Sequence, residues 1–389
     1  MIGVCIMKRL FKISAAAAMV GVLALAASGC GGGSSKKANI TNEMVKFGVT
    51  NFADNLDPAD NFFSWVVMRY GLGECLVKFD NKMNATPWLA DKWSVSDDKL
   101  TWTFHINDKV KFSNGDKLTA EIAKESLERT FKLSNRAQSI FRYAEIKADG
   151  QNLMIKTVNP TPSLPGMLAD PLFIIIDTKV KDRDIKKQGP ICTGPYAVKT
   201  YSKAKAVMVA NPNYWDGTVP FKNAEIPTID DPNTRAMALP LYAEATQADA
   251  KKIGIKVNMK NVDYNVLDPM RQKGQFDLII SNILTANTGD PEVYLNWYWK
   301  SNINGSQPQN STGYSNPKFD ALSDKLAVEF DPAKRRQYMI EMQQILLDDG
   351  VALFFGYPKT NMVSKAGVAN ANIFPADYYW LTKDIAPKQ

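Results

Sequence analysis

Residues 89–121 read LADKWSVSDDKLTWTFHINDKVKFSNGDKLTAE, and this stretch decides the fold of the N-terminal part of the chain. Polar and apolar side chains alternate from Thr101 to Ile106, which predicts a strand that is half buried on a sheet. Asn107-Asp108 predicts a turn into a second strand, Val110–Phe112. Thr119 is a typical N-cap residue, so a helix should begin directly after it. The stretch therefore predicts a hairpin followed by a helix.

The N-terminus has the pattern of a secretory signal. A basic segment at residues 8–12 precedes an apolar run, residues 13–27, that is too short for a transmembrane helix. The small residues before Cys30 resemble a lipobox, in which Cys30 would be lipidated and become the mature N-terminus; an ordinary cleaved signal peptide is the alternative. We therefore expect a signal peptide at 1–29 and a lipid-anchored flexible tether at 30–42. This places the protein in the cell envelope, facing the periplasm or the exterior.

Length and charge narrow the class of protein. A chain of 389 residues normally makes two domains. The formal charge is +7, and removing the three positive charges of the signal, which has no acidic residue, leaves +4. These charges are interspersed with acidic residues rather than clustered, so the sequence shows no nucleic-acid footprint.

The cysteine and histidine content argues against an enzyme. Cys75 and Cys192 are the cysteines that remain after the signal and the lipidation site, and in an exported protein they either form a disulfide or stay as buried thiols. His105 is the only histidine, and it lies in the middle of an alternating strand. A Ser-His-Asp or Cys-His site would need this residue, and no metal-ligand cluster is apparent. We expect no catalytic activity, no cofactor and no metal held by a cluster of protein ligands.

The remaining elements alternate between strands and helices. In the N-terminal part, an apolar helix runs through Trp65 and Tyr70. Period-2 or fully apolar runs predict strands at 44–50, 143–148, 152–157, 172–176, 197–201 and 206–210. In the C-terminal part we expect a helix at 241–252 and strands at 255–259, 276–280 and 351–355. Two further helices should begin at Pro317 and Pro332, with Asn316 and Asp331 as their N-caps.

The opening stretch and three shorter ones resemble the family 5 extracellular solute-binding proteins, the peptide and nickel receptors of ABC importers. The shorter stretches are CTGPY (192–196), NPNYWDG (211–217) and GDPEVYL (289–295). The resemblance implies an α/β fold of the type II periplasmic-binding-protein class, with two lobes that close on a ligand by hinge motion. The implied domains are a first lobe at 43–239 with a small subdomain inserted at about 79–180, a second lobe at 241–365, and a C-terminal segment, 366–389, that returns to the first lobe.

One departure from the family pattern lies between Leu239 and Pro240. The run that ends at Leu239 should continue into a long block that includes the first half of the second lobe. Here it is followed directly by residues that belong far downstream, so a block on the order of a hundred residues or more is missing. The strands 255–259 and 276–280 would then have lost sheet neighbours, with exposed edges and apolar faces. The second lobe should be incomplete.

The resemblance also implies a ligand site, which needs a concave surface with aromatic walls and a few directed polar groups. We expect ligand contacts from Phe52, Tyr70, Arg136, Asn282, Asn287, Thr288 and Asp290. Arg136 is similar to the basic-aromatic segment with which nickel-type relatives hold the carboxylates of a metal chelate. A solvated surface arginine is the alternative for Arg136, and core packing is the alternative for the two aromatic residues.

Asn287 stands where peptide-binding relatives place an aspartate that pairs with the peptide's α-amine. An amide accepts a hydrogen bond from an ammonium group but cannot neutralise its charge. Asp290 could play that part, although an aspartate before a proline is often a turn or cap residue.

The sequence predicts a monomeric substrate-binding lipoprotein that captures a peptide, a similar small solute or a nickel chelate and delivers it to an ABC permease. The alternative is a truncated lipoprotein that no longer transports, acting as a sensor, an adhesin or a remnant.

Overall fold

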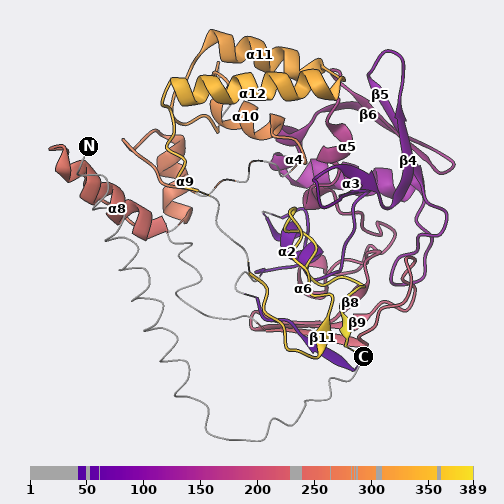
Figure 1. Ribbon diagram of the computed structural model, residues 1–389. Helices are drawn as coiled ribbons and strands as arrows, with labels where there is room; N and C mark the ends of the chain where they lie inside the picture. The colour runs from indigo at the N-terminus through magenta and orange to yellow at the C-terminus, as the bar shows by residue number, and fades with distance from the viewer. Residues whose placement is uncertain are drawn as a thin grey trace, which may run out of the picture. The chain divides into compact units, whose positions relative to one another are not determined.

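Figure 1 shows the computed structural model of the chain. The structure describes residues 43–49, 53–60, 62–227, 239–262, 264–281, 283, 285, 288–303, 309–356 and 361–388. Residues Thr41–Gln389 form one compact unit, and the contacts below lie within it. In the described ranges, no helix is long and apolar enough to cross a membrane.

The opening stretch supplies two adjacent strands, one at the edge and one inside, of a four-stranded antiparallel sheet. Its strand order is β4-β5-β7-β6, with bounds Ala90–Val95, Thr101–Ile106, Asn152–Thr157 and Tyr143–Asp149. Trp102, Phe104 and Ile106 point into the core, as the alternation predicts. Helix α3 (Ala120–Leu133) packs against this sheet and begins after Thr119, whose Oγ1 accepts the backbone N–H of Ile122 at 3.3 Å. The predicted strand 101–106 and the helix that follows are confirmed.

The hairpin is not the one that the sequence predicts. Strand β5 pairs with β4, which precedes it, and with β7. Residues 110–112 form no strand, because turns on both sides leave only an isolated bridge between Lys111 and Lys117. The second turn is tight, with the Phe112 N–H donating to the Asp116 carbonyl at 2.8 Å.

A second four-stranded sheet carries the start of the first lobe. Its order is β1-β10-β9-β8, with bounds Met44–Lys46, Asn223–Pro227, Lys205–Ala210 and Tyr196–Tyr201. Strand β1 runs parallel to β10, and the other pairs are antiparallel. Two further pairs are short: β2 (Val77–Phe79) with β3 (Ala85–Pro87), and β11 (Val368–Ala369) with β12 (Ala386–Pro387).

Short helices connect these sheets. They are α2 (Phe63–Arg69), α4 (Asn135–Ile140), α5 (Leu164–Met167), the 3-10 helix η1 (Pro171–Phe173) and α6 (Ile185–Gln188). The prediction of a strand at 172–176 is wrong, although the segment is fully buried. Asp170 Oδ1 accepts the Leu172 N–H at 2.9 Å and starts the 3-10 turn, and only Ile176 makes a bridge, to Cys192.

Three helices of the C-terminal part build a separate apolar cluster. They are α10 (Glu292–Trp299), α11 (Pro317–Val328) and α12 (Pro332–Asp348), and α11 and α12 lie side by side (Figure 1). The cluster is formed by Tyr294, Leu295, Trp299, Phe319, Leu326, Met342 and Leu346. Each large apolar side chain buried in this way contributes about 1.5–3 kcal/mol of transfer free energy. The predicted N-caps Asn316 and Asp331 are confirmed, since each accepts backbone N–H groups of the helix that follows.

The strands expected in the second lobe are missing. Helices α8 (Leu239–Lys252) and α9 (Tyr264–Gln272) are present, but 255–259, 276–280 and 351–355 have no strand assignment. Their sequence pattern favours strands, yet a strand needs a neighbour to bond its backbone groups. These segments lack such a neighbour in the described part of the chain.

Candidate functional site

Arg136 lies at the N-terminal end of α4 and is largely buried rather than a solvated surface residue. Its Nη1 is 3.6 Å from Oδ1 of the fully buried Asp170, and its Nη2 donates to Ser64 Oγ at 3.3 Å. The guanidinium carbon lies 4.8 Å from the ring centroid of Phe62, which is cation–π distance. Arg136 Nε is buried and has no hydrogen-bond partner among the described residues. This N–H is therefore a donor in need of an acceptor.

A second arginine extends this arrangement along α2. The Arg69 guanidinium lies 4.3 Å from the ring centroid of Trp380 and 5.8 Å from that of Trp65. It also forms an ion pair with Asp377, with 2.6 Å between Nη2 and Oδ2. The Trp65 indole N–H is buried and lacks an acceptor within the part of the chain that the structure describes.

These side chains form one cluster of arginines and aromatic rings. Phe62 and Trp65 have ring centroids 6.0 Å apart, and Trp65 and Tyr378 have centroids 5.8 Å apart. We call the following six residues the arginine–aromatic cluster: Phe62, Trp65, Arg69, Arg136, Tyr378 and Trp380. Of these six, only Arg136 was predicted from the sequence as a ligand contact. The cap residue Phe62 and the α2 residues Trp65 and Arg69 stand at helical spacing, which is a signal that could have been used.

Of the other ligand contacts predicted in the first lobe, the structure describes only Tyr70. Tyr70 is fully buried beside Arg69, and burial raises the pKa of its hydroxyl. This fits the core-packing alternative. Phe52 and Cys30 lie outside the described residues.

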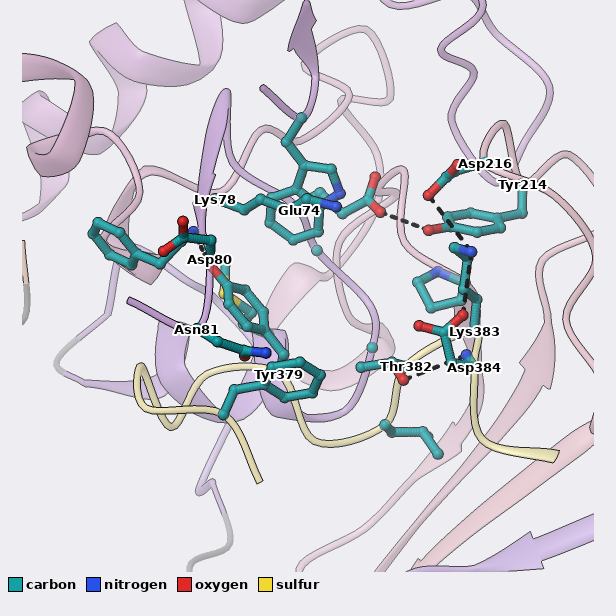
Figure 2. Close-up of a pocket in the computed structure, with 18 residues that line it drawn as sticks. Glu74, Lys78, Asp80, Asn81, Tyr214, Asp216, Tyr379, Thr382, Lys383 and Asp384 are labelled. Atoms are coloured by element: carbon teal, nitrogen blue, oxygen red, sulfur yellow. Dashed lines mark hydrogen bonds and ion pairs between the residues drawn. The ribbon is translucent and has the colours of Figure 1, made fainter. Parts of the chain in front are cut away.

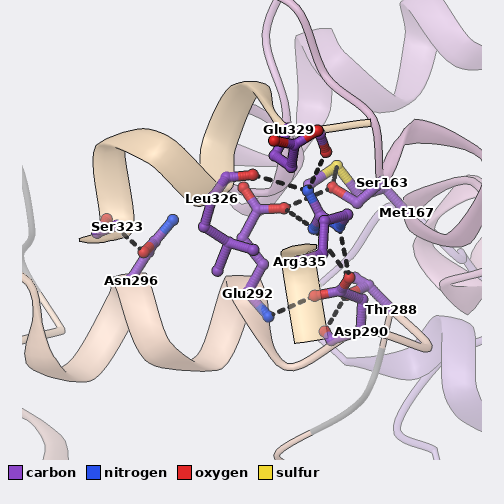
Figure 3. A network of polar contacts seen from close by, with 10 residues as sticks. All are labelled: Ser163, Met167, Thr288, Asp290, Glu292, Asn296, Ser323, Leu326, Glu329 and Arg335. Carbon is purple, nitrogen blue, oxygen red and sulfur yellow. Dashed lines mark hydrogen bonds and ion pairs between the residues drawn. The ribbon is translucent and has the colours of Figure 1, made fainter. Parts of the chain in front are cut away.

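Thr288 and Asp290 belong to a polar network that also includes Arg335 (Figure 3). Thr288 is buried and its Oγ1 donates to the Asp290 carbonyl at 3.0 Å. Asp290 Oδ1 accepts the Glu292 N–H at 2.8 Å and so starts α10, while Oδ2 accepts from Arg335 Nη2 at 2.8 Å. The aspartate is thus a cap residue whose second oxygen is held by an arginine. Asn282 and Asn287 lie outside the described residues.

Arg335 is the centre of this network. Its Nη2 also donates to Glu292 Oε2 at 2.8 Å, and its Nη1 donates to the carbonyls of Leu326 and Glu329 at 2.7 and 3.1 Å. Glu292 Oε2 in turn accepts the Ser163 hydroxyl at 2.8 Å. Burial raises the pKa of Glu292, against the opposing effect of Arg335. The network ties α10 and α12 to the loop before α5.

The two remaining cysteines are free, buried thiols, which is the second of the two alternatives that the sequence leaves open. Both Cys75 and Cys192 are buried, and Cys75 Sγ donates to the Asp170 carbonyl at 3.3 Å. Burial raises the pKa of both thiols. Buried thiols with raised pKa values are unreactive, because the thiolate is the reacting species.

A cavity of about 300 Å³ lies beside the buried Glu74 (Figure 2). Glu74 accepts hydrogen bonds from Thr193 Oγ1 at 2.8 Å, Tyr214 OH at 3.1 Å and Trp215 Nε1 at 2.8 Å. Burial, opposed by these donors, raises the pKa of Glu74 to about 7. The stretches CTGPY and NPNYWDG supply these three donors, so the buried carboxyl of Glu74 explains Thr193, Tyr214 and Trp215 in them. No local pattern in the sequence pointed to Glu74.

His105 and the acidic residues give no metal site in the described ranges. No group of three or more His, Cys, Asp or Glu residues in these ranges could hold a metal ion. His105 Nδ1 lies 2.9 Å from Asp91 Oδ1 across the β4–β5 pair, which is a structural position.

Comparison with known proteins identifies the family of the chain. A family model described as "Bacterial extracellular solute-binding proteins, family 5 Middle" matches residues 84–242 and 240–306, more than half of the chain. The chain belongs to the family 5 extracellular solute-binding proteins. Members of this family bind small ligands or peptides for ABC importers and are not enzymes. The two matched segments of this family 5 chain meet at residues 240–242, where the sequence predicts a missing block.

Several curated proteins are similar to this family 5 chain. The nickel-binding protein of Staphylococcus aureus is 25% identical over 331 residues, covering 84% of this chain and 64% of the relative. The nickel-binding periplasmic protein of Escherichia coli is 34% identical over 181 residues, covering 42% and 33%. The dipeptide-binding protein of Lactococcus lactis is 28% identical over 323 residues, covering 73% and 55%. The chain thus spans less than two thirds of the length of each.

Solved structures support the fold of the family. The S. aureus nickel-binding protein in complex with Ni(L-His)2 superposes with a TM-score of 0.72 at 18% identity, covering 89% of this chain and 100% of that one. The ABC transporter-associated periplasmic binding protein of Helicobacter pylori in complex with the peptide STSA has a TM-score of 0.70 at 15% identity, covering 89% of this chain and 98% of that one. The fold is that of type II periplasmic binding proteins, as predicted.

Proposed function

We propose that the chain is a substrate-binding lipoprotein of an ABC importer, and that it captures a carboxylate-bearing small solute. A peptide and an amino-acid chelate of nickel both belong to this class, and relatives named for each are similar to the chain. The bound solute would then be delivered to a membrane permease by a monomeric, lipid-anchored protein.

The unpaired donors of the arginine–aromatic cluster carry the proposal. Arg136 Nε and Trp65 Nε1 are buried N–H groups without acceptors among the described residues. A buried unsatisfied donor costs about 1–3 kcal/mol, and a ligand oxygen placed there removes that cost. Both groups donate, so the complementary ligand atom is an acceptor. A carboxylate is the strongest acceptor that a peptide or an amino-acid chelate offers.

In the described part of the second lobe, Asp290 is a weaker partner for a ligand ammonium group than the arginine–aromatic cluster is for a ligand carboxylate. The Asp290 carboxylate already accepts from Arg335 and from the Glu292 N–H. The charge of Asp290 is already compensated by Arg335, so a ligand ammonium would gain less from pairing with it. We therefore assign recognition to the carboxylate end of the solute.

Binding can be tested by thermal shift and calorimetry with dipeptide pools and with Ni(II)–histidine. A solute at a hundred times its Kd stabilises the folded chain by about 2.7 kcal/mol. Arg136→Gln should abolish the shift, whereas Arg142→Gln should not, because Arg142 is an exposed arginine six residues away. Equal loss in both variants, or no shift with either solute class, would contradict the proposal.

The lipid anchor at Cys30 is a separate part of the proposal. It rests on the signal-like N-terminus and on the small residues before Cys30. Intact mass spectrometry of the chain purified from bacterial membranes should show a diacylglycerol-modified Cys30. Cys30→Ala should release the protein from the membrane fraction.

A second candidate is a transport-incompetent lipoprotein. The observation that favours it is the absence of strands at 255–259, 276–280 and 351–355, because two-lobe closure needs a complete second lobe. A purified chain that folds cooperatively but binds neither peptides nor nickel chelates would support this alternative.

A further inference from the structure

The cavity beside Glu74 shares no residue with the arginine–aromatic cluster, although α2 and the C-terminal segment contribute to both. Met68 and Tyr379 line the cavity, whereas their neighbours Arg69 and Tyr378 belong to the cluster. Neighbouring residues of the same two segments therefore contribute to two different places. The function proposed above uses the cluster and leaves the cavity without a role.

Aromatic rings form one wall of this cavity. The Tyr379 ring stands edge-on to Trp88 and to Phe374, with centroids 5.7 and 5.8 Å apart. Its hydroxyl oxygen accepts the Phe79 N–H at 3.0 Å, which holds the ring in place. Rings held in this way can pack against the ring of a ligand in an edge-to-face or offset arrangement. The wall therefore favours an aromatic ligand.

Lys78 brings a positive charge to the cavity that the described residues do not neutralise. It is the central residue of β2, and its half-buried side chain lines the cavity while Val77 and Phe79 are buried. The Nζ atom lies 5.8 Å from the ring centroid of Trp88, and the described residues form no ion pair with it. An ammonium group in this position can accept an anionic group of a ligand.

Asp80 brings a negative charge to the same side of the cavity. It stands two residues after Lys78 at the end of β2, so both side chains point to one face of the extended chain. Its carboxylate accepts the N–H groups of Lys82 and Asn84 and the Asn84 side-chain amide, all of them neutral donors. A carboxylate offers about four acceptor positions, so one is left for a ligand cation. Lys78 and Asp80 make no ion pair with each other in the described structure.

The other charged groups that line the cavity have partners of their own. Lys383 Nζ lies 4.0 Å from Asp216 Oδ2 and 3.2 Å from Asp384 Oδ1. Glu74 accepts hydrogen bonds from three donors. Figure 2 shows Lys78 and Asp80 on one side of the cavity and the Lys383 group on the other. Lys78 and Asp80 are thus the two opposite charges that a ligand can complete.

The size of the cavity and the spacing of these charges define the ligand. A volume of about 300 Å³ is at the lower end of the range for small-molecule sites, which suits a single residue rather than a longer peptide. A free α-amino acid carries its carboxylate and its ammonium group on one carbon atom. One such molecule can therefore pair with Lys78 and Asp80 together while its ring packs on the aromatic wall.

We infer that this cavity is a second ligand site, which binds a free aromatic α-amino acid. The ligand carboxylate pairs with Lys78, its ammonium group pairs with Asp80, and its ring packs against Tyr379 and Trp88. The inference goes beyond the proposed function, which rests on the arginine–aromatic cluster and on delivery to a permease.

Isothermal titration calorimetry of the full chain carrying Arg136→Gln tests this site by itself, because that variant should lose the first site. The probe is L-phenylalanine, and each of three analogues lacks one of its features. 3-Phenylpropionate lacks the ammonium group, phenethylamine lacks the carboxylate, and L-alanine lacks the ring. Each analogue should bind about tenfold or more weakly than phenylalanine, because a charge-assisted bond or the packing of a ring is lost.

Lys78→Met and Asp80→Asn test the two charges of the protein. Each change, added to Arg136→Gln, should weaken the binding of phenylalanine by about tenfold or more. Lys82→Met is the matched control, since Lys82 is exposed in the same turn and does not line the cavity. Thermal unfolding checks that each variant folds. The analogue series leaves the cavity unchanged, so it tests the inference even where a cavity variant does not fold.

Three outcomes would overturn the inference. One is the absence of phenylalanine binding to Arg136→Gln, and another is equal binding of phenylalanine and 3-phenylpropionate. The third is an affinity for phenylalanine that Lys78→Met leaves unchanged. The proposed function is judged separately, because Lys78→Met alone should keep the thermal shift with dipeptides or Ni(II)–histidine that Arg136→Gln abolishes.

Discussion

The indole of Trp215 donates to the carboxylate of Glu74 at 2.8 Å, joining two residues that are 141 positions apart. Glu74 is fully buried, and a buried carboxyl is tolerated only when its oxygens are hydrogen-bonded. The loop at 211–217 is thereby fixed to the segment that follows α2.

Replacing Trp215 with phenylalanine should destabilise the protein. The change removes one donor to Glu74 and keeps an aromatic ring, so we expect the free energy of unfolding to fall by about 1–3 kcal/mol. Urea unfolding followed by circular dichroism measures it. Trp93→Phe is the control, because the Trp93 ring packs on Phe104 and its indole N–H makes no hydrogen bond to the described residues. An equal loss in both variants would mean that ring size, not the hydrogen bond, matters.

Glu74 should make stability depend on pH. Its pKa in the folded chain is about 7, raised by burial from 4.5. Between pH 4.5 and 7 the folded chain keeps this proton while the unfolded chain releases it, so the free energy of unfolding falls as pH rises. The expected fall is about 3 kcal/mol, complete above pH 7.

The measurement is the difference between wild type and Glu74→Gln in urea unfolding at pH 4 to 8. Subtraction removes the contributions of other groups, such as Asp60, whose pKa is lowered mainly by its hydrogen bond with Lys186. A difference that stays constant across this range would show that Glu74 titrates normally in the folded chain.

Arg335 should be the most sensitive position of the polar network. Arg335→Met leaves Asp290 and Glu292 without their shared cation, and breaking a buried ion pair on one side costs about 3–5 kcal/mol. Arg336→Met is the matched control, since the neighbouring arginine is exposed. In thermal unfolding, the Tm of Arg335→Met should lie clearly below that of Arg336→Met. If Arg335→Met is as stable as the control, the network contributes nothing to stability.

Asp290→Asn tests the two roles considered for this residue. If the carboxylate serves Arg335 and α10, the variant should unfold at lower urea concentration but keep its affinity for the solute identified by calorimetry. A loss of affinity at unchanged stability would instead assign Asp290 to the ligand.

The thiols of Cys75 and Cys192 should be unreactive in the folded chain. Both are buried and their pKa values are raised by burial. Peptide mapping after iodoacetamide treatment should find neither residue modified under native conditions and both modified in urea without reductant. A disulfide-linked peptide in the non-reduced map would overturn this expectation.

Local patterns predicted elements in both the N-terminal and the C-terminal parts of the chain. The strand 101–106, the capped helix after Thr119 and the helices after Asn316 and Asp331 follow from side-chain alternation and capping, which depend on residues close in sequence. The prediction of a strand at 172–176 failed because the chain turns at Asp170, which an apolar run does not reveal.

The candidate site was predicted only in part, because some of its residues meet through contacts between distant parts of the sequence. Arg136 was found from its neighbours in sequence, whereas Arg69 becomes part of the cluster through Asp377 and Trp380, which lie some three hundred positions away. Asp290 likewise has its ion-pair partner, Arg335, on a helix that is distant in sequence.

The family, the strand at 101–106 and the capped helices are written in contiguous residues, so the sequence was sufficient to predict them. The contacts of the folded chain were needed to show that Glu74 binds two of the family's signature stretches and that Arg136 joins an aromatic cluster. They also show that 255–259, 276–280 and 351–355 form no strand. A strand needs a neighbour, and a buried charge or a binding cluster needs partners from elsewhere in the chain, so local patterns were not enough for these features.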